Sequence, residues 1–459
     1  MYTVCQKRIK NTSSWSYRYC EERATFAWHL YNAALFRIRQ IFTGWDKSVR
    51  SENEQEVFSE VAALEAAYPN IHIRKVISYA HLEKLMRVTE NPDFFAGLPM
   101  QTAQAVVRQA VQDFKNWLAA IRAYKKDQSS FTGKPRMPHY KKTPCTFTLT
   151  NQDAVLYGQT LKLPGTKNRL DVDRIPEDCV LKEVKVAPFY GQYTVYMTVE
   201  YTGTPSVADG GNFASIDFGT DNFAAIVATD GSSAIYKGGA VLSENHFFAK
   251  KRAKAVSIIT KGHERMYAGS HYLDRLSARH ENFVKDQLHK ISRSIIEFCE
   301  KHHVSVLVLG QNKLWKQHTA MQGANNQKFV QMPITRLMQM IEYKAVMAGI
   351  VIMHQEESYT SKASFVDGDY IPVYGRGDQD TAFSGRRVKR GLYRCKNGMT
   401  VNADLNGAAN ILRKAFPSAW ERRACMSVFS DFSFLKDPEV FGFHELNPKS
   451  IPAERIMGA

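Results

Sequence analysis

Residues 213–228 constrain the fold of this chain more than any other segment. Two apolar runs, 213–218 and 223–228, flank a Gly-Thr-Asp-Asn sequence, and this pattern predicts a β-hairpin. Beyond the hairpin, strand patterns alternate with long helical patterns, which is typical of a sheet covered by helices. The sequence therefore predicts an α/β domain that begins at this hairpin.

Two aspartates stand where this domain would carry chemistry. Asp217 lies between Ile216 and Phe218, and a carboxylate inside an apolar strand is costly to desolvate unless it is paired or binds a cation. Asp404 begins a helical pattern in which Gly407 and two following alanines permit close approach to a sheet. Purely structural roles remain open for both residues. Asp217 would then form an ordinary salt bridge, and Asp404 would occupy a favourable position at the start of a helix.

The chain before the hairpin is organised differently. Residues 2–10 predict a short strand, and residues 15–127 are mostly helical. A segment with one glycine and two prolines, 132–138, marks a boundary after the helices. Further strands are predicted at 146–149, 180–186 and 192–201. Because strands lie on both sides of the helices, we expect one β-barrel interrupted by a helical module.

The charge of the chain indicates a polyanionic partner. Lys and Arg number 61 against 45 Asp and Glu, which gives a formal charge of +16. Three basic runs, 122–142, 250–265 and 376–396, include or adjoin aromatic residues such as Tyr140 and Tyr393. This combination fits phosphate contact with base stacking better than three solvated faces. An anionic membrane surface is the alternative, but no basic amphipathic helix supports it.

Several classes of protein are excluded at this stage. The N-terminal residues lack the apolar stretch of a signal peptide, and the longest apolar run, 345–353, is far shorter than the ~20 residues that cross a bilayer. The seven cysteines are odd in number and nowhere spaced as C-x-x-C, which argues against a disulfide framework and a four-cysteine zinc site. We expect a cytoplasmic protein with no membrane partner.

Four motifs in order along the chain carry a resemblance to a known family. They are G-K-P-R-x-P-x-Y from Gly133, D-F-G-x-x-N-x-A from Asp217, Y-T-S-K-x-S from Tyr359 and D-x-N-x-A-A-N-I from Asp404. The second and fourth resemble the first and third RuvC motifs, and together the four resemble TnpB, an RNA-guided nuclease related to Fanzor and to type V CRISPR effectors. The resemblance covers the chain from its first strand to about Phe416.

The resemblance implies a multidomain α+β fold, in which an RNase H-like (RuvC) α/β nuclease domain joins a wedge β-barrel with an inserted helical recognition module. The barrel is assigned to 1–12 and 128–208, and the helical module to 13–127. The nuclease domain is assigned to 209–357 and 400–416, with a target-nucleic-acid-binding insert at 358–399. No motif covers the tail at 417–459.

The resemblance also implies phosphodiester hydrolysis with two magnesium ions, held by several carboxylates. The family usually places a glutamate after the strand at 304–310, but Gln311, Asn312 and Lys313 follow here. The next strand ends in two glutamates, and adjacent strand residues point to opposite faces. Only one of the two can therefore face the site. Fanzor and some TnpB branches resemble this arrangement, with a glutamate three residues before the Thr-Ser pair, which here is Glu357. The resemblance therefore implies Glu357, or failing it Glu356, as the third ligand beside the two aspartates, and a surface carboxylate at the strand end remains the alternative.

Nucleic-acid contact is predicted for ten residues of the basic runs. They are Lys134, Arg136, Tyr140, Lys141, Lys250, Lys251, Arg252, Arg387, Lys389 and Arg390.

Asp286 and His289 either touch nucleic acid or pack on the sheet, and a mobile loop is expected at Trp315 and Lys316. Many relatives carry a four-cysteine zinc ribbon in the insert, but this chain has Ala363, Asp367 and only Cys395 there, so we expect no zinc.

The partners implied are a double-stranded DNA target and a guide RNA, which is either a transposon-encoded omega-type RNA or a CRISPR-type RNA. The family implies association with the nucleoid of a prokaryote. The leading hypothesis is a magnesium-dependent RNA-guided DNA endonuclease, and the alternative is a catalytically inactive, repressor-like RNA-guided DNA-binding protein. A DNA transposase is disfavoured, because the partner class uses a His-hydrophobic-His motif and this chain has no His-x-His.

Overall fold

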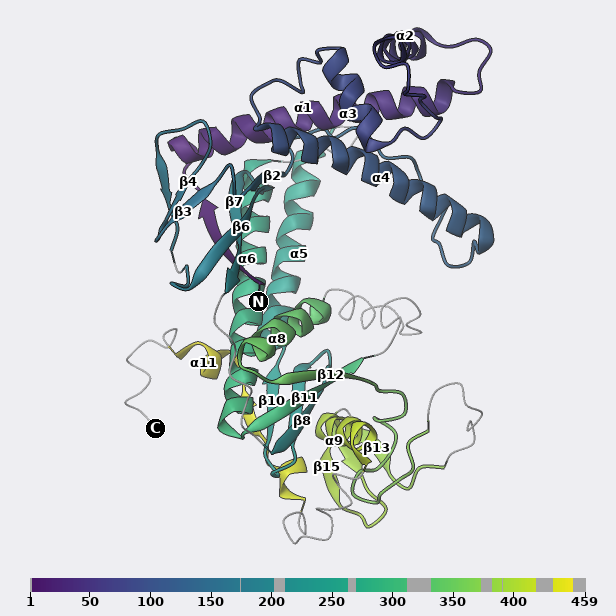
Figure 1. Ribbon diagram of the computed structural model, residues 1–459. Helices are drawn as coiled ribbons and strands as arrows, with labels where there is room; N and C mark the ends of the chain where they lie inside the picture. The colour runs from purple at the N-terminus through teal and green to yellow at the C-terminus, as the bar shows by residue number, and fades with distance from the viewer. Residues whose placement is uncertain are drawn as a thin grey trace. The chain divides into compact units, whose positions relative to one another are not determined.

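The computed structural model describes residues 2–173, 175–201, 211–262, 270–311, 332–372, 382–389, 391–417 and 432–448. The chain forms two compact units, Met1–Gly203 and Thr204–Ala459, each of which mixes helices and strands (Figure 1). Among the described residues, no helix combines the length and the apolar character that a bilayer-spanning segment needs.

The first unit joins four helices to two antiparallel sheets. Its helices are α1 (Trp15–Gly44), α2 (Glu52–Ala67), α3 (Tyr79–Val88) and α4 (Met100–Lys126). Its strands are β1 (Tyr2–Ile9), β2 (Phe147–Thr150), β3 (Val155–Tyr157), β4 (Thr160–Lys162), β5 (Arg169–Asp171), β6 (Cys179–Phe189) and β7 (Gln192–Tyr201). Ser14 caps α1, and a capping box between Ser51 and Glu54 begins α2.

The larger sheet of this unit has the order β1-β7-β6-β2, and β1 pairs along its whole length with β7. The predicted N-terminal strand therefore joins the strands that follow the helices, and α1 to α4 form an insertion between them. The described strands do not close on themselves, so the expected barrel stays a prediction. The small sheet β3-β4-β5 was not anticipated, because three-residue strands carry no clear alternation.

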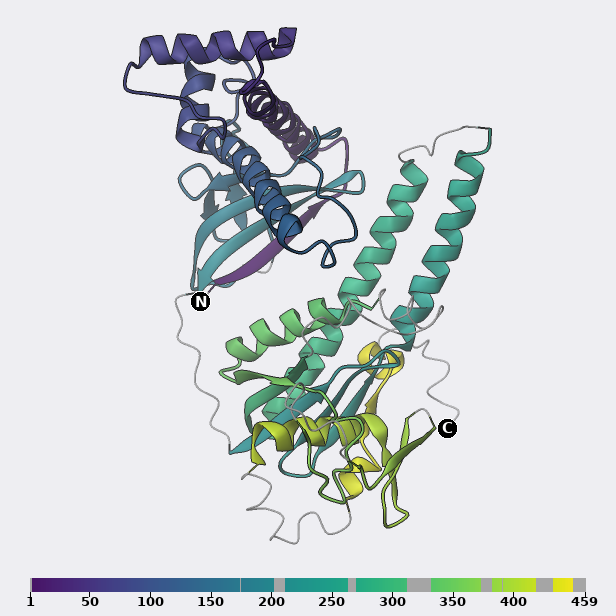
Figure 2. The ribbon, with the colours of Figure 1, turned by 90° about the vertical axis from the view of Figure 1, so that its right-hand side faces the viewer.

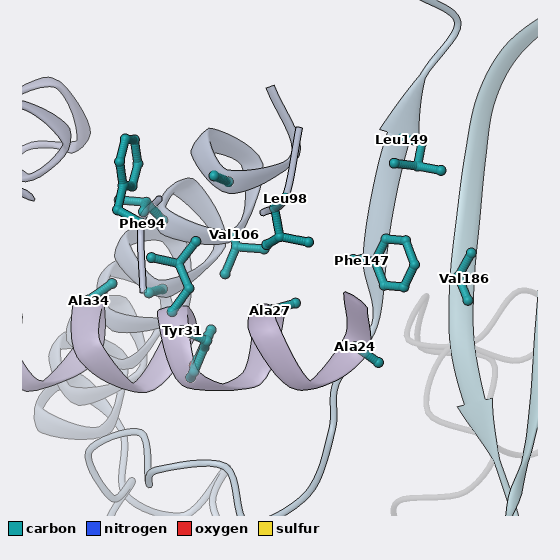
Figure 3. Packing of buried hydrophobic residues seen from close by; sticks show 14 of the residues in the cluster. Ala24, Ala27, Tyr31, Ala34, Phe94, Leu98, Val106, Phe147, Leu149 and Val186 are labelled. Atoms are coloured by element: carbon teal, nitrogen blue, oxygen red, sulfur yellow. The ribbon is translucent and has the colours of Figure 1, made fainter. Parts of the chain in front are cut away.

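One apolar core fills the first unit. The helical character predicted for residues 15–127 is confirmed, and residues of α4 such as Val106 and Phe114 are buried in one core with residues of α1. Small residues on α1, including Ala24 and Ala27, let β2 approach with Phe147 (Figure 3). This packing ties the inserted helices to the sheet.

The second unit is built on one mixed sheet. Its elements are β8 (Asn212–Asp217), β9 (Asn222–Ala228), β10 (Ser233–Lys237), α5 (Gly239–Ile259), α6 (His271–Lys301), β11 (Val304–Gln311), α8 (Ile334–Met347), β12 (Val351–Glu356), β13 (Arg386–Lys389), β14 (Leu392–Arg394), β15 (Thr400–Asn402), α9 (Ala403–Ala415), a 3-10 helix (Ser433–Leu435), β16 (Glu439–Phe441) and α11 (Phe443–Leu446). The predicted hairpin is confirmed as β8 and β9, in antiparallel register from Ala214–Ala228 to Asp217–Ala225.

The sheet has the order β12-β11-β8-β9-β10-β16. β8, β9 and β10 are antiparallel neighbours, whereas β11 and β12 run parallel to β8. Helices α6 and α8 pack on one face with Leu288, Ile291 and Ile341, and α9 covers the other face. The sixth strand, β16, comes from the tail, where the sequence showed no motif, and pairs parallel with β10.

Two further features surround this sheet. Helices α5 and α6 form an antiparallel pair that extends beyond the strands (Figure 2), and His280 of α6 joins Asn245 of α5 by a hydrogen bond of 2.8 Å. The insert between β12 and α9 contributes the antiparallel strands β13, β14 and β15, which lead directly into α9.

Candidate active site

The side chains of β8 alternate between the two faces of the sheet, and this alternation aims Asp217 at α9. Ala214 and Ile216 join the core under α6 and α8. On the opposite face, Ser215 donates a hydrogen bond of 2.6 Å to the carbonyl of Ala408 in α9. Gly407 is needed at this crossing, because a Cβ there would collide with Oδ2 of Asp217.

The environment of Asp217 disfavours its charge. Burial raises the pKa of this carboxyl well above its ordinary value, and the charges of Glu357 and Asp404 raise it further, while Arg387 opposes them. Asp217 therefore lies within electrostatic reach of both other predicted carboxylates. Such an arrangement is typical of a site that gathers negative charge for a cation.

Glu357 directly follows β12 and reaches toward Gly310 on the neighbouring strand β11. A Cβ built at position 310 would lie 2.8 Å from Oε2 of Glu357 and 2.7 Å from Cδ1 of Ile411. Glu357 thus fills the space that a side chain on β11 would take. Burial, followed by the charge of Glu356, raises the pKa of Glu357 to about 7, against the opposing charge of Lys414.

Glu356 points elsewhere. Its Oε2 forms an ion pair of 2.6 Å with Nζ of Lys414, and its Oε1 accepts a hydrogen bond of 2.7 Å from the amide of Ser358. Burial opposes ionisation here, but the hydrogen bonds from Lys414 and Ser358 outweigh it and hold the pKa of Glu356 below its ordinary value. Of the two glutamates, the geometry therefore favours Glu357 beside the aspartates.

Asp404 stands in the first turn of α9. Asn402 caps the helix, since its Oδ1 accepts the backbone amides of Asp404 and Leu405. The Asp404 carboxylate accepts a hydrogen bond of 2.7 Å from Nδ2 of Asn222 and lies 3.1 Å from Nη2 of Arg387. Asn222 belongs to the hairpin turn that the sequence marked, and it links the two aspartate motifs directly.

The fit to magnesium can be judged from these donors. Among the described residues, no three His, Cys, Asp or Glu side chains already enclose a space for an ion as they stand. Carboxylate oxygens are nevertheless the ligands that Mg²⁺ prefers, and Asp217 lies close enough to Glu357 and Asp404 for both charges to raise its pKa. A divalent cation would offset this repulsion, so the residue types fit the group.

The predicted nucleic-acid residues fall in several places. Lys250, Lys251 and Arg252 are exposed on α5, and Arg387 and Lys389 are exposed on β13, whereas Arg390 lies outside the described residues. In the first unit, Lys134 and Arg136 are exposed.

Tyr140 and Lys141 are held against α1. The Arg39 guanidinium lies 4.9 Å from the ring centre of Tyr140, and the Lys141 ammonium lies 3.7 Å from that of Tyr31. The backbone of Lys141 also exchanges hydrogen bonds with Asn32. Lys141 therefore anchors the G-K-P-R segment, and its contact with nucleic acid stays a prediction.

Other predicted residues have structural roles. Burial first, then Lys344, lower the pKa of His289 to about 4, and Lys344 donates to its carbonyl at 2.8 Å. His289 thus belongs to the packing of α6 with α8. Asp286 pairs with Lys290 one turn along the same helix. Trp315 and Lys316 lie outside the described residues.

In the insert between β12 and α9, hydrogen bonds to a carboxylate link two segments where the family resemblance would place zinc-binding cysteines. Oδ2 of Asp367 accepts from the hydroxyl of Ser364 at 2.6 Å and from the amide of Lys396 at 2.9 Å. Cys395 is buried beside these groups. The two arms of the insert are therefore linked through a carboxylate.

Sequence reasoning did not identify Gly310, and it quoted Asn222, Asn406 and Asn410 as motif residues without assigning them a role. The two asparagines of α9 are fully buried, four residues apart, inside the fourth motif. That spacing on one helix face was the available signal, whereas the role of Gly310 depends on a neighbouring strand and had none.

Comparison with known proteins gives two family matches, which lie mostly within the second unit. A family described as a probable transposase (OrfB_IS605) matches residues 194–316, and a Cas12f1-like TNB domain matches residues 335–411. Among curated proteins, the TnpB-like protein ORF457 of Acidianus two-tailed virus is 27% identical over 212 residues, covering 45% of this chain and 42% of that protein. The CRISPR-associated endodeoxyribonuclease Cas12f2 of a Micrarchaeota archaeon is 25% identical over 251 residues, covering 49% and 41%.

The alignments thus span less than half the length of these curated relatives. Among solved structures, a Cas12f1 complex with single-guide RNA and target DNA resembles the chain with a TM-score of 0.42 and 13% identity, over 86% of this chain and 82% of that one. A second Cas12f ternary complex has a TM-score of 0.34.

Proposed function

We propose that this chain, a member of the TnpB family, is an RNA-guided DNA endonuclease. A guide RNA, transposon-encoded or CRISPR-type, would pair with one strand of a double-stranded DNA target, while the protein reads a short motif beside it. Asp217, Glu357 and Asp404 would hold two magnesium ions for hydrolysis of the phosphodiester.

One observation carries the proposal. Asp217 on β8 lies within electrostatic reach of Glu357, after β12, and of Asp404 on α9, although the three residues are far apart in the sequence. The missing glutamate of β11 does not leave the site open, because Oε2 of Glu357 occupies the space beside Gly310. Burying a carboxylate in that space costs free energy, which favours a metal-binding role over a decayed site.

The sheet supports this interpretation. The order β10-β9-β8-β11-β12, with an antiparallel first half and two parallel strands after β8, is the arrangement expected of an RNase H-like domain. The carboxyl end of β8 and the residue after β12 then fall at the same edge, because these two strands run in one direction.

Each residue of the site would have its own role in the hydrolysis. Asp217 and Glu357 would hold magnesium, and Asp404 would complete the ligand set once Arg387 is displaced from it. A bound divalent cation supplies charge for the scissile phosphate and lowers the pKa of the attacking water. Arg387, released from Asp404, can then donate two hydrogen bonds to the phosphate. Asn222 keeps Asp404 oriented through this exchange.

The basic surfaces would bind the nucleic acids. Lys250, Lys251 and Arg252 on α5 and Lys389 on β13 present exposed positive charge within the unit that carries the carboxylates. Lys134 and Arg136 present it on the other unit. Because such contacts release counterions, we expect affinity for target DNA to fall steeply with salt.

The test is cleavage of a plasmid that matches the RNA copurified with the protein. We expect magnesium-dependent cutting by the wild-type complex and none by Asp217→Asn, with guided binding retained by both. Glu439→Gln is a matched control, since it also removes a carboxylate from the second unit but only breaks the surface pair with Lys301. Tight guided binding by a wild-type complex that leaves the plasmid intact would contradict the nuclease proposal.

A further inference from the structure

Helix α9 carries a polar stripe besides the apolar face that packs on the sheet. Asn406, Asn410 and Lys414 are spaced four residues apart and so lie along one side of the helix. The two asparagines are fully buried, and the Lys414 side chain is 9% exposed. Polar groups buried to this extent need partners, and theirs lie almost entirely in the segment that follows β12.

The stripe contacts this segment, residues 356–365, from one end to the other. Lys414 pairs with Glu356 at 2.6 Å and donates to the carbonyl of Ser358 at 3.2 Å. Asn410 uses both amide hydrogens, on the carbonyls of Thr360 at 2.9 Å and Ala363 at 2.7 Å.

Asn406 completes the set. Its Nδ2 donates to Ala363 at 2.8 Å, and its Oδ1 accepts the amide of Phe365 at 2.9 Å. Three side chains of one helix thus make six contacts with ten consecutive residues. Those residues contain no strand or helix of their own after Glu356 and have only turn hydrogen bonds, so the stripe adds contacts that tie the segment to α9.

Glu357 lies inside this segment and is fixed by it. Thr360, which Asn410 holds, donates to the carbonyl of Glu357 through its hydroxyl at 2.8 Å and through its amide at 3.2 Å. The preceding side chain, Glu356, is directed away from the site by its ion pair with Lys414. The Glu357 side chain is left with the direction of Gly310 and Asp217.

We infer that Asn406, Asn410 and Lys414 are positioning residues that hold Glu357 in the site, and that Glu356 is an anchor in this system rather than a metal ligand. The inference rests on the proposed function. Because Asp404 is on the same helix, α9 sets the relative placement of two of the three carboxylates.

The experiment uses the guide-loaded full chain with Asn410→Ala and Lys414→Met, and Lys414→Arg as the variant that keeps the ion pair. A catalytic group displaced by about 1 Å costs on the order of 100-fold in rate. We expect Asn410→Ala and Lys414→Met to lower the cleavage rate about 10- to 100-fold while target binding is unchanged. Lys414→Arg should recover most of the rate.

Amide hydrogen exchange of the protein without magnesium provides a readout independent of cleavage. We expect faster exchange within 357–365 in Asn410→Ala and Lys414→Met, with α6 and α8 unchanged. Lys344→Met is the matched control, because Lys344 is another lysine of the second unit that donates to a backbone carbonyl and to a side chain, but on the opposite face of the sheet. It should leave exchange within 357–365 and the cleavage rate as in wild type.

The outcomes separate the two proposals. A wild-type complex that cuts no matched DNA would overturn the proposed function. Unchanged exchange within 357–365 in both variants would overturn the inference alone. Faster exchange with a full cleavage rate would also overturn it, since the segment would then be ordered for a reason unrelated to Glu357.

Discussion

The two faces of the six-stranded sheet have different roles, although the same strands form both. Under α6 and α8, the side chains of β8 are Ala214 and Ile216, and they meet only apolar partners. Under α9, the intervening side chains are Ser215 and Asp217, and their partners are a helix carbonyl and other carboxylates. One face therefore stabilises the fold, and the other tolerates unfavourable charge. A strand can serve both because its residues alternate.

The strongest test of this difference is to neutralise Glu356 and Glu357 one at a time. Glu357→Gln should lower the cleavage rate by about 10³-fold or more, because a metal ligand contributes several kcal/mol. Glu356→Gln should cost about 10-fold, as expected for a group that only orients a ligand. Single-turnover cleavage of matched DNA measures both. Equal losses for the two variants would mean that the assignment of their roles is wrong.

Filling the space at β11 is the next largest change. Gly310→Ala places a Cβ 2.8 Å from Oε2 of Glu357 and should displace it, with an expected loss of about 10- to 100-fold in cleavage. Gly239→Ala is the control, since a Cβ there meets nothing within 4 Å. A Gly310→Ala variant that cuts at the wild-type rate would show that Glu357 does not work from this position.

The apolar face should respond in the opposite sense. Ile295 is fully buried under the sheet, and Ile295→Ala should lower the free energy of unfolding by about 2–5 kcal/mol through the cavity it leaves. The cleavage rate per folded molecule should not change at a temperature below the unfolding transition. Denaturant unfolding and active-site titration together measure this, and a large loss of rate would mean that the two faces are coupled.

The smallest expected effect is a pH dependence of stability without metal. The pKa of Glu357 is about 7 in the folded chain against an ordinary value of 4.5, so the stability that it contributes is complete below pH 4.5 and is lost as pH rises through 7. In a chelating buffer, the melting temperature should fall between pH 5 and pH 8. The fall should be smaller in Glu357→Gln and in wild type with magnesium, and a flat wild-type profile would contradict the raised pKa.

Local pattern predicted much of the fold. The hairpin around Asp217 combines two apolar runs with a turn, and residues 15–127 have a mostly helical pattern, so both were visible and both are confirmed. The strand β16 was not, because three residues pairing at a sheet edge leave no periodicity. The small sheet β3-β4-β5 was missed for the same reason, and closure of the barrel stays a prediction.

For the site residues, too, what could be predicted depended on the local sequence pattern. Asp217 and Asp404 could be marked from their motifs, and the small residues of α9 indicated how they would meet. The choice between Glu356 and Glu357 could not be made locally, because it depends on Lys414 from a helix nearly sixty residues away. The catalytic roles of these residues stay predictions until cleavage is measured.

Gly310 has a consequence for how such chains are recognised. A survey that demands an acidic residue after the strand following the long helix pair would pass over this sequence, although Oε2 of Glu357 lies beside Gly310 near the end of that strand. The signature to search for is a correlated exchange: a glycine on one strand, and a carboxylate just beyond the end of the neighbouring strand. If this chain cleaves DNA as proposed, genomes screened for that exchange should yield further nucleases that such a survey omits.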